Sequence, residues 1–509
     1  MPGAYEGLTA FYGDLHNHCG VSYGHGSLDD AYRNARLQLD FASVTPHAYW
    51  PDIPAGVPGL EDVVAYHQAG FAKAAAGWRA YRAATDALNE AGRFITFPSW
   101  EWHSLRHGDH CIYYHGPGGE IVHAPDIEQL RIALRTVERT GTRAFLIPHH
   151  IGYRQGRRGV NWADWTPEFS PVAEIISMHG AAESDTAPYP YLHTMGPRDG
   201  GSTYHAGLQR GHIVGAVGST DHHSAHPGSY GYGRLAVWAT ELTRDSIWEA
   251  IAARRTYALT GDRIGLRFSL NDAPMGAVVP YARERAIAVA VEGGDALDTV
   301  EVLCNGTVIQ RWPQPLPSTV RGDGPVQVTL ELGWGEADRD TDWMVDLVVE
   351  RGALLAVEPR FRGHVVVTPQ GREQQGYAFS SWDQPAPNHV RFTTRTFGNP
   401  TVRTPATQGI CLTLAGDTRT AITGMINGNP IAVTIGDLEA GSSTGYLGAF
   451  LAPAYHFHRV VRSDESHRAF AYTHRLAGSG RDWYTVRVRQ RNDQWAWSSP
   501  IWVEALPRC

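Results

Sequence analysis

Histidines gather in the short stretch GDLHNHCGVSYGHG, residues 13–26, which contains His16, His18 and His25. If this stretch ends a β-strand, His16 and His18 point to the same side, because successive residues of a strand alternate between its two faces. Two imidazoles on one side can bind a single metal ion. Of the 25 histidines in the chain, 19 lie between His16 and His226. We therefore expect a metal centre in the first half of the chain.

Further histidines and acidic residues stand at the ends of short apolar runs that resemble buried strands. The runs are 41–47, 93–101, 143–150, 172–180 and 213–223, and the polar residues at their ends are His47, Glu101, His149 with His150, His179, and Asp221 with His223. Helical stretches separate the runs, and this alternation favours an α/β fold with a parallel sheet or barrel. Because the carboxyl ends of barrel strands share one face, these side chains are predicted to meet there.

The types of the candidate ligands restrict the metal. Imidazole and carboxylate ligands suit Zn, Mn or Fe, and a shared carboxylate allows more than one ion, so we expect two or three divalent ions. The five cysteines are scattered and form no CxxC pair; they are Cys19, Cys111, Cys304, Cys411 and Cys509. This distribution argues against a disulfide framework and against a thiolate zinc site.

The second half of the chain has a different pattern of predicted secondary structure. Short alternating strands separated by turn residues follow residue 263, and Asn305-Gly306 is a hairpin signal. We predict two domains: an α/β domain over 1–262 and a β-rich domain over 263–509. Within the latter we expect an immunoglobulin-like sandwich from about 264–350 and 480–505, with an insertion over 360–475.

Composition narrows the classes of partner. The formal net charge of -8 shows no basic excess, so nucleic acid is not an expected partner. Neither a signal-peptide pattern nor a membrane-spanning apolar run is visible in the sequence, which favours a cytoplasmic protein that does not bind membranes. A small-molecule substrate is the expected ligand, and association into a homo-oligomer stays open.

The ordered motifs resemble a known family. GDLHNHCGVSYGHGSLDDAYRNARLQLDFASVTPH, SWEWHS, LIPHH and GSTDHH are similar to the PHP (polymerase and histidinol phosphatase) metallo-hydrolases. The segments ARRTYALTGDRIGLRFSLNDAPMG and YTVRVRQRNDQWAWSSPIW resemble more narrowly the DUF3604 branch. The resemblance implies a distorted (β/α)7 barrel with a two- or three-metal centre at the carboxyl ends of its strands.

Position by position, the resemblance implies a set of metal ligands: His16, His18, His47, Glu101, His110, His149, Asp221 and His223. Two positions depart from the family pattern. The usual aspartate after the first histidine pair is His25 here, and the usual Asp-His of the second motif is Pro46-His47. His25 is the candidate replacement ligand. The exchange of carboxylate for imidazole lowers the negative charge of the site, which favours a borderline metal over Mg.

Such a centre predicts hydrolysis by a metal-activated hydroxide. We expect a phosphoesterase acting on a small molecule; an ester, lactone or amide hydrolase is the alternative, and a non-catalytic metal- or carbohydrate-binding protein is the second alternative. The candidate proton-transfer residues are Asp221, His150 and His179. The candidate substrate-binding residues are Arg154, Arg157 and Arg158, which follow the His149 strand, and the aromatic residues Trp50 and Trp102.

Overall fold

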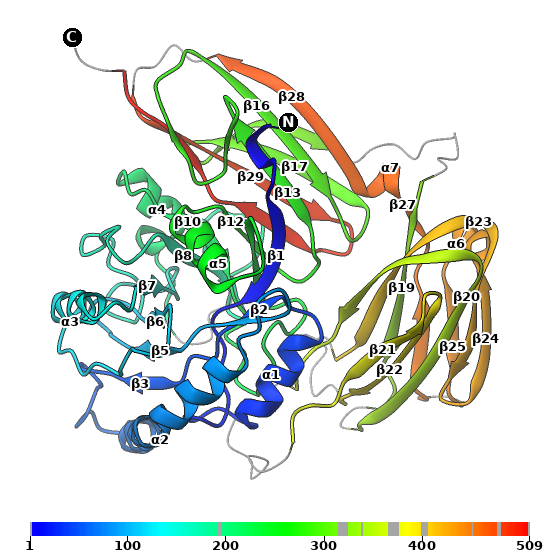
Figure 1. Cartoon of the computed structure of the whole chain (residues 1–509), viewed down its shortest axis with the longest axis horizontal. Coiled ribbons are helices and arrows are strands. Elements are labelled where there is room, and N and C mark those ends of the chain that lie inside the picture. The colour runs from blue at the N-terminus through cyan, green and yellow to red at the C-terminus, as the bar shows by residue number, and fades with distance from the viewer. Residues whose placement is uncertain are drawn as a thin grey trace.

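A computed structural model describes residues 3–191, 196–313, 324–336, 339–364, 376–398, 406–449, 451–475 and 480–506. Figure 1 shows three units: an α/β unit that carries the N-terminal half, a β-sandwich above it, and a second β structure at its side. We call them the α/β unit (3–262), the sandwich unit (264–313 and 467–506) and the inserted unit (324–462). Among the described residues, no helix combines the length and apolar character needed to cross a bilayer.

The strands of the α/β unit divide among three sheets. One contains β1 (Thr9–Asp14), β2 (Phe41–Ala42), β4 (Ile95–Thr96), β11 (Arg234–Ala239) and β12 (Thr256–Leu259). The second contains β3 (His47–Tyr49), β5 (Ser99–Trp102), β6 (His110–Tyr114) and β7 (Ala144–Pro148). The third contains β8 (Val172–Ser177), β9 (Gly180–Ala181) and β10 (Gly215–Gly218). The unit is therefore mixed α/β, as the sequence predicted.

The closed (β/α)7 barrel stays a prediction, because these three sheets do not join into one hydrogen-bonded cylinder among the described residues. Two local causes are visible. Pro98 lacks a backbone donor, and the expected strand at 93–101 is split there into β4 and β5. β5, β6 and β7 also pair antiparallel, whereas a barrel of this type needs parallel neighbours.

Helices cover the outside of the α/β unit, and the main ones are α1 (Leu28–Arg36), α2 (Glu61–Ala87), α3 (Ile127–Arg139), α4 (Tyr204–Gln209) and α5 (Arg244–Ala252). Local sequence explains where α1 and α3 begin. Ser27 and Asp30 form a capping box at α1, and the Asp126 side chain accepts from the Gln129 amide at α3. Two short 3-10 helices, Gly3–Tyr5 and Gly200–Ser202, complete the unit.

The sandwich unit packs two sheets face to face. The first contains β13 (Gly265–Leu270), β14 (Ala273–Pro274), β16 (Glu284–Glu292) and β28 (His467–Arg475). The second contains β15 (Val278–Val279), β17 (Leu297–Cys304), β18 (Thr307–Pro313), β29 (Asp482–Gln490), β30 (Trp495–Ser498) and β31 (Ile501–Val503). Since β30 also pairs with β12, this second sheet continues without a break into the α/β unit.

The inserted unit is built on one nine-stranded sheet and a core of its own. Its strands are β19 (Val326–Gly333), β20 (Thr341–Arg360), β21 (Ser381–Ala386), β22 (His389–Thr396), β23 (Gln408–Ile426), β24 (Asn429–Thr434), β25 (Ser443–Tyr446), β26 (Ala454–Phe457) and β27 (Val461–Arg462), and its helix is α6 (Ile435–Ala440). The short helix α7 (Ser463–Ser466) leads back to the sandwich. The unit thus begins at β19, earlier than the expected residue 360, and ends before β28.

Candidate metal centre

Two loops bring the first candidate ligands together. His16 and His18 follow β1, and Asp221 follows β10. The loops lie side by side because the Asp221 amide donates to the His16 carbonyl at 2.8 Å and the His18 amide donates to the His222 carbonyl at 2.8 Å. As a result, His18 Nε2 lies 3.0 Å from Asp221 Oδ1 and 3.1 Å from His16 Nε2.

Glu101 lies at the middle of the histidine cluster. Strand β3 pairs with β5 so that His47 stands opposite Glu101. His47 Nδ1 lies 2.5 Å from Glu101 Oε2, and His149 Nε2 lies 2.8 Å from Glu101 Oε1. His18 Nε2 is 3.6 Å from Oε2. With imidazoles around both of its oxygens, this carboxylate has the surroundings of a group that bridges two metal ions.

Asp221 is the second carboxylate of the cluster, and both of its oxygens face imidazoles. His179 Nε2 lies 2.9 Å from Oδ2, and His150 Nε2 lies 3.7 Å from the same oxygen. The His223 ring centroid is 4.4 Å from that of His18. The structure therefore gathers His16, His18, His47, Glu101, His149, His150, His179, Asp221 and His223 into one cluster.

The backbone is held in an unusual conformation at two of these residues. His150 has a φ of 56° and Asp221 a φ of 52°, in the left-handed region that residues with a side chain seldom adopt. Arg158, beside the cluster, has a φ of 72°. Such conformations persist where the surrounding structure enforces them, and they concentrate at functional sites.

Electrostatics favour the ionised form of the two carboxylates and the neutral form of His47. Burial raises the pKa of Glu101, but His103, His47 and His149 outweigh it and hold that pKa well below its usual value. The pKa of Asp221 is likewise held well below its usual value, since His16, His179 and His18 outweigh the effect of burial. Burial, with the nearby His18, lowers the pKa of His47 well below its usual value. Ionised carboxylates and neutral imidazole are the forms that act as ligands.

For His16, burial lowers the pKa, but Cys111, Glu174 and Asp221 outweigh it and hold that pKa well above its usual value. The pKa of His149 is likewise raised, to about 10, because Cys111 and Glu101 outweigh burial and the nearby His16.

The donor atoms are spaced for metal ions. Sets of donors whose atoms all lie within 4.8 Å of one another include His16–His18–Glu101, His18–His47–His223 and Glu101–Asp109–His149–His150. Within the described part of the chain, the buried Glu101 Oε2 makes no hydrogen bond, although ring nitrogens approach it. An unsatisfied buried carboxylate oxygen among converging ring nitrogens fits a bound cation. These side chains thus form a buried cluster suited to divalent metal.

Four residues around the cluster were not identified as site residues from the sequence. They are His103, Asp109, Cys111 and Glu174, and all are buried. Glu174 Oε2 lies 2.9 Å from His16 Nδ1, and Cys111 Sγ lies 3.6 Å from His149 Nδ1. The sequence argument against a thiolate at the metal did not anticipate Cys111, which forms a possible donor set with His16 and His149. The sequence offered one indication of Glu174 as a site residue: it is an acidic residue inside the otherwise apolar run 172–180.

Strand register separates His110 from its neighbour Cys111. Cys111 stands opposite Glu101, whereas His110 stands opposite Trp102 and therefore faces the other side of the sheet. There His110 Nδ1 lies 2.9 Å from the Gly108 carbonyl oxygen. The structure does not bring His110 to the face on which Glu101 lies.

His25 lies at the edge of the cluster. Its amide donates to the His223 carbonyl at 2.8 Å, and its ring centroid lies 6.2 Å from that of Tyr377 in the inserted unit. Its backbone is thus tied to a candidate ligand, and its role as a ligand stays a prediction.

The candidate substrate residues separate into two groups. Arg158 is next to the cluster: its Nε donates to Asp109 Oδ2 at 2.6 Å, and its guanidinium lies 5.3 Å above the Trp50 ring. Arg154 and Arg157 are exposed. Trp102 is fully buried in the core beneath the helices, with its Nε1 donating to the Ala124 carbonyl. Only Arg158 and Trp50 of these five residues lie beside the cluster.

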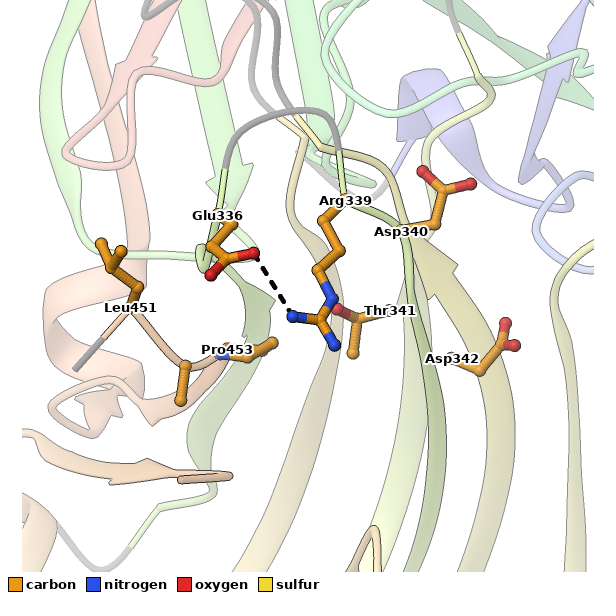
Figure 2. A pocket seen from close by; sticks show the side chains of 8 residues that line it. Glu336, Arg339, Asp340, Thr341, Asp342, Leu451 and Pro453 are labelled. Carbon is orange, nitrogen blue, oxygen red and sulfur yellow. Dashed lines mark hydrogen bonds and ion pairs between the residues drawn. The ribbon is translucent and has the colours of Figure 1, made fainter. Parts of the chain in front are cut away.

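Two open hollows lie outside the cluster. One of about 620 Å³ is lined by residues of the loops that follow β3, β5, β7 and β9, namely Asp52, Leu105, Arg106, Arg154, Gln155, Gly156 and Asp199. The other, of about 450 Å³, lies at the edge of the inserted unit, and Figure 2 shows its Glu336–Arg339 ion pair of 3.3 Å. The second hollow contains no residue of the metal cluster.

Comparison with known proteins gives weak similarity over parts of the chain. An uncharacterized protein of Chlamydia pneumoniae is 26% identical over 252 residues, which cover 46% of this chain and 40% of that protein. Uncharacterized proteins of Chlamydia muridarum and Chlamydia trachomatis are 28% and 27% identical over 171 residues, 30% of this chain and 28% of each of theirs. The chain thus spans less than half the length of these relatives.

A crystal structure of a two-domain protein containing a predicted PHP-like metal-dependent phosphoesterase, from Bacteroides vulgatus, aligns over 84% of this chain and 96% of its own. The sequence identity is 14% and the TM-score is 0.29. The family model that matches is DUF3604, a protein of unknown function, over residues 215–273. This segment contains β10, Asp221 and His223, so the DUF3604 resemblance inferred from the sequence is confirmed over residues 215–273.

Proposed function

We propose that this chain is a metal-dependent hydrolase whose centre lies at the cluster around Glu101 and Asp221. The observation that supports the proposal is the convergence of two buried carboxylates with at least six imidazoles, which form several groups of three or four donors whose atoms lie within 4.8 Å of one another. A purely structural cluster gains nothing from so many buried imidazoles in one place, since their desolvation is costly without a cation to bind.

The residues divide into three ligand sets, two of which share Glu101. His16, His18, Glu101 and Asp221 would hold one ion, and Glu101, His149 and Asp109 would surround a second, with His47 and His223 as ligands of a third. When bound, divalent ions of this kind lower the pKa of a coordinated water to roughly 7 and polarise a substrate oxygen. Zn, Mn and Fe fit the donor types.

His150 and His179 are the candidates for proton transfer. Both have Nε2 near Asp221 Oδ2, at 3.7 Å and 2.9 Å. In addition, Tyr153 Oη lies 3.4 Å from His179 Nδ1 and orients that ring. With Asp221 ionised, His179 donates through Nε2–H to Oδ2, so this ring can take up a proton at Nδ1 while the carboxylate stabilises the charged form, and can then protonate a leaving group.

A phosphate ester is the proposed substrate, because Arg158 adds a fixed positive charge beside the cluster. Its side chain is largely buried and is held by Asp109 and the ring of Trp50. A guanidinium recognises the oxygens of phosphate or carboxylate groups. An ester, lactone or amide hydrolase on the same centre is the alternative, since these reactions use the same activated water.

Turnover of a chromogenic panel tests the proposal. The metal-supplemented protein is offered a phosphomonoester, a phosphodiester, a carboxylic ester and an anilide, with the Asp221→Asn variant as control. Hydrolysis of the phosphomonoester that is lost in Asp221→Asn supports a phosphoesterase, and hydrolysis of the carboxylic ester alone transfers the assignment to the alternative. No turnover of any probe by the metal-loaded protein contradicts a hydrolase.

A further inference from the structure

A separate polar cavity lies where the three units meet. It has a volume of about 250 Å³ and is lined by Tyr230 of the α/β unit, by Asp295, Asn492 and Gln494 of the sandwich unit, and by Thr329, Glu331, Arg360, Arg362, Gln408, Gly409 and His458 of the inserted unit. None of these residues belongs to the metal cluster. Cavities between domains are common sites for small ligands.

Buried ion pairs and hydrogen bonds build the walls of this cavity. Arg360 is 4% exposed; its Nε lies 3.0 Å from Asp262 Oδ1, and its Nη1 donates to Thr329 Oγ1 at 3.0 Å. The buried Asp262 also accepts from the Tyr230 hydroxyl at 2.7 Å and from Asn492 Nδ2 at 2.8 Å. These groups satisfy one another across three units, so the cavity is formed before any ligand binds.

Other lining groups keep hydrogen-bonding capacity for a ligand. Arg362 donates through Nη1 to the Thr407 carbonyl at 2.7 Å, and its guanidinium lies 4.8 Å above the Tyr230 ring. Glu331 Oε2 lies 2.9 Å from His458 Nε2. Asp295 Oδ1 accepts from the Ala296 amide at 2.7 Å. A carboxylate has about four acceptor sites and a guanidinium has five donors, so both donors and acceptors remain even though Glu331 also accepts a hydrogen bond from Thr407.

We infer that this cavity binds a small, neutral, polyhydroxylated molecule of the monosaccharide class. A hydroxyl both donates and accepts, so neighbouring hydroxyls can satisfy the carboxylates of Asp295 and Glu331 and the guanidinium of Arg362 together. An anion would face the two carboxylates, and a cation would face the two arginines. The volume equals that of about eight water molecules at ~30 Å³ each, which suits one sugar ring rather than a chain.

The site also touches the segment that carries a candidate metal ligand. The Tyr230 amide donates to the Phe361 carbonyl at 3.0 Å, and the Gly363 amide donates to Ser229 Oγ at 3.0 Å. Tyr230 and Asp221 belong to the same connection between β10 and β11. The sugar cavity and the metal centre therefore lie on one connection of the α/β unit, although they share no lining residue.

Calorimetric titration of the full chain tests the inference, with glucose, galactose and mannose as sugar probes and inorganic phosphate and glycine as charged probes. We expect saturable binding of at least one sugar, and weakening by about tenfold or more in Arg362→Gln, because a hydrogen bond to a charged group contributes about 1.5–3 kcal/mol. The matched control is Arg419→Gln, whose arginine pairs with the exposed Asp417 in the same unit. It should bind the sugar as the wild type does.

Two further variants distinguish a variant that fails to fold from a sugar that binds elsewhere in the protein. Glu331→Gln keeps the size of the side chain and replaces Arg362→Gln as the test variant if the latter does not fold. It too should weaken sugar binding. Asp221→Asn should leave sugar binding unchanged, because a loss there would place the sugar at the metal centre and overturn the inference. Absence of saturable sugar binding, saturation by phosphate or glycine alone, or wild-type affinity in both cavity variants would also overturn it.

Discussion

The Nδ1 atom of His16 lies 2.9 Å from the Oε2 atom of Glu174, although 158 positions separate the two residues. Both side chains are almost fully buried. This contact leaves His16 Nε2 directed at Asp221 Oδ1, 3.3 Å away. A carboxylate behind a histidine fixes its ring orientation and tautomer and makes it a stronger ligand. Glu174 is therefore a positioning residue of the candidate centre.

Replacement of Glu174 by Gln should lower metal affinity about 10- to 100-fold, since loss of such a carboxylate weakens the histidine as a ligand. Competition with a chromophoric chelator measures the dissociation constant directly. The control is Glu168→Gln, whose carboxylate pairs with Arg135 on the surface and should leave affinity unchanged. Equal affinity in Glu174→Gln and wild type would show that Glu174 does not position His16.

Arg158→Gln should raise KM for a phosphomonoester more than it lowers kcat, while the metal content stays that of the wild type. The reason is that the guanidinium would contact the substrate oxygens, whereas no metal ligand is removed. Steady-state kinetics with elemental analysis on the same sample separates the two effects. An unchanged KM would remove Arg158 from the substrate site; Arg139→Gln, in the last turn of α3, is the control.

Arg487 joins the sandwich unit to the α/β unit through a buried ion-pair group. Its Nη1 lies 2.9 Å from Glu183 Oε2, and its Nε donates to Glu301 Oε2 at 2.8 Å. Arg487→Leu leaves the buried Glu183 carboxylate without its arginine, whereas Glu301 keeps Arg311, and the change should destabilise the fold by about 3–5 kcal/mol. The midpoint of chemical denaturation measures this loss. Arg489→Leu, which removes a half-exposed arginine of the same strand, should shift the midpoint far less.

Glu331 should make the inserted unit sensitive to acid. Burial raises the pKa of Glu331, but its hydrogen bonds with His458 and Thr407 outweigh this and bring the pKa to about 2, below the ordinary 4.5. A carboxyl group with a depressed folded-state pKa stabilises the fold above about 4.5, and the contribution disappears as the pH falls towards 2. The difference in denaturation midpoint between wild type and Glu331→Gln should therefore shrink between pH 6 and pH 3. A constant difference would contradict the depressed pKa.

Most of the features that could be predicted from the sequence depend on short-range patterns. Asn305-Gly306 forms the two-residue turn between β17 and β18, with both residues at positive φ, as its dipeptide indicated. The spacing of His16 and His18 placed two imidazoles on one side of the chain. Such features depend on neighbouring residues alone, so a single sequence contains the information.

Strand register and long-range pairing could not be predicted from the sequence alone. Whether His110 or Cys111 reaches the metal cluster depends on which of them stands opposite Glu101 in the sheet. A register shift of one residue would exchange the two faces of the strand. Glu174 joins His16 only because the third sheet of the α/β unit packs beside the loop after β1. The start of the inserted unit was placed late, because β19 and β20 alternate like sandwich strands although they belong to another sheet.

Elemental analysis of the purified protein tests the central claim most directly. Wild-type protein should contain two or more Zn, Mn or Fe ions per chain, and His18→Ala and Asp221→Ala should lose bound metal while circular dichroism shows that the β structure of both remaining units is intact. A metal-free wild-type protein after supplementation, or equal metal content in the wild type and both variants, would contradict a metal centre at this cluster.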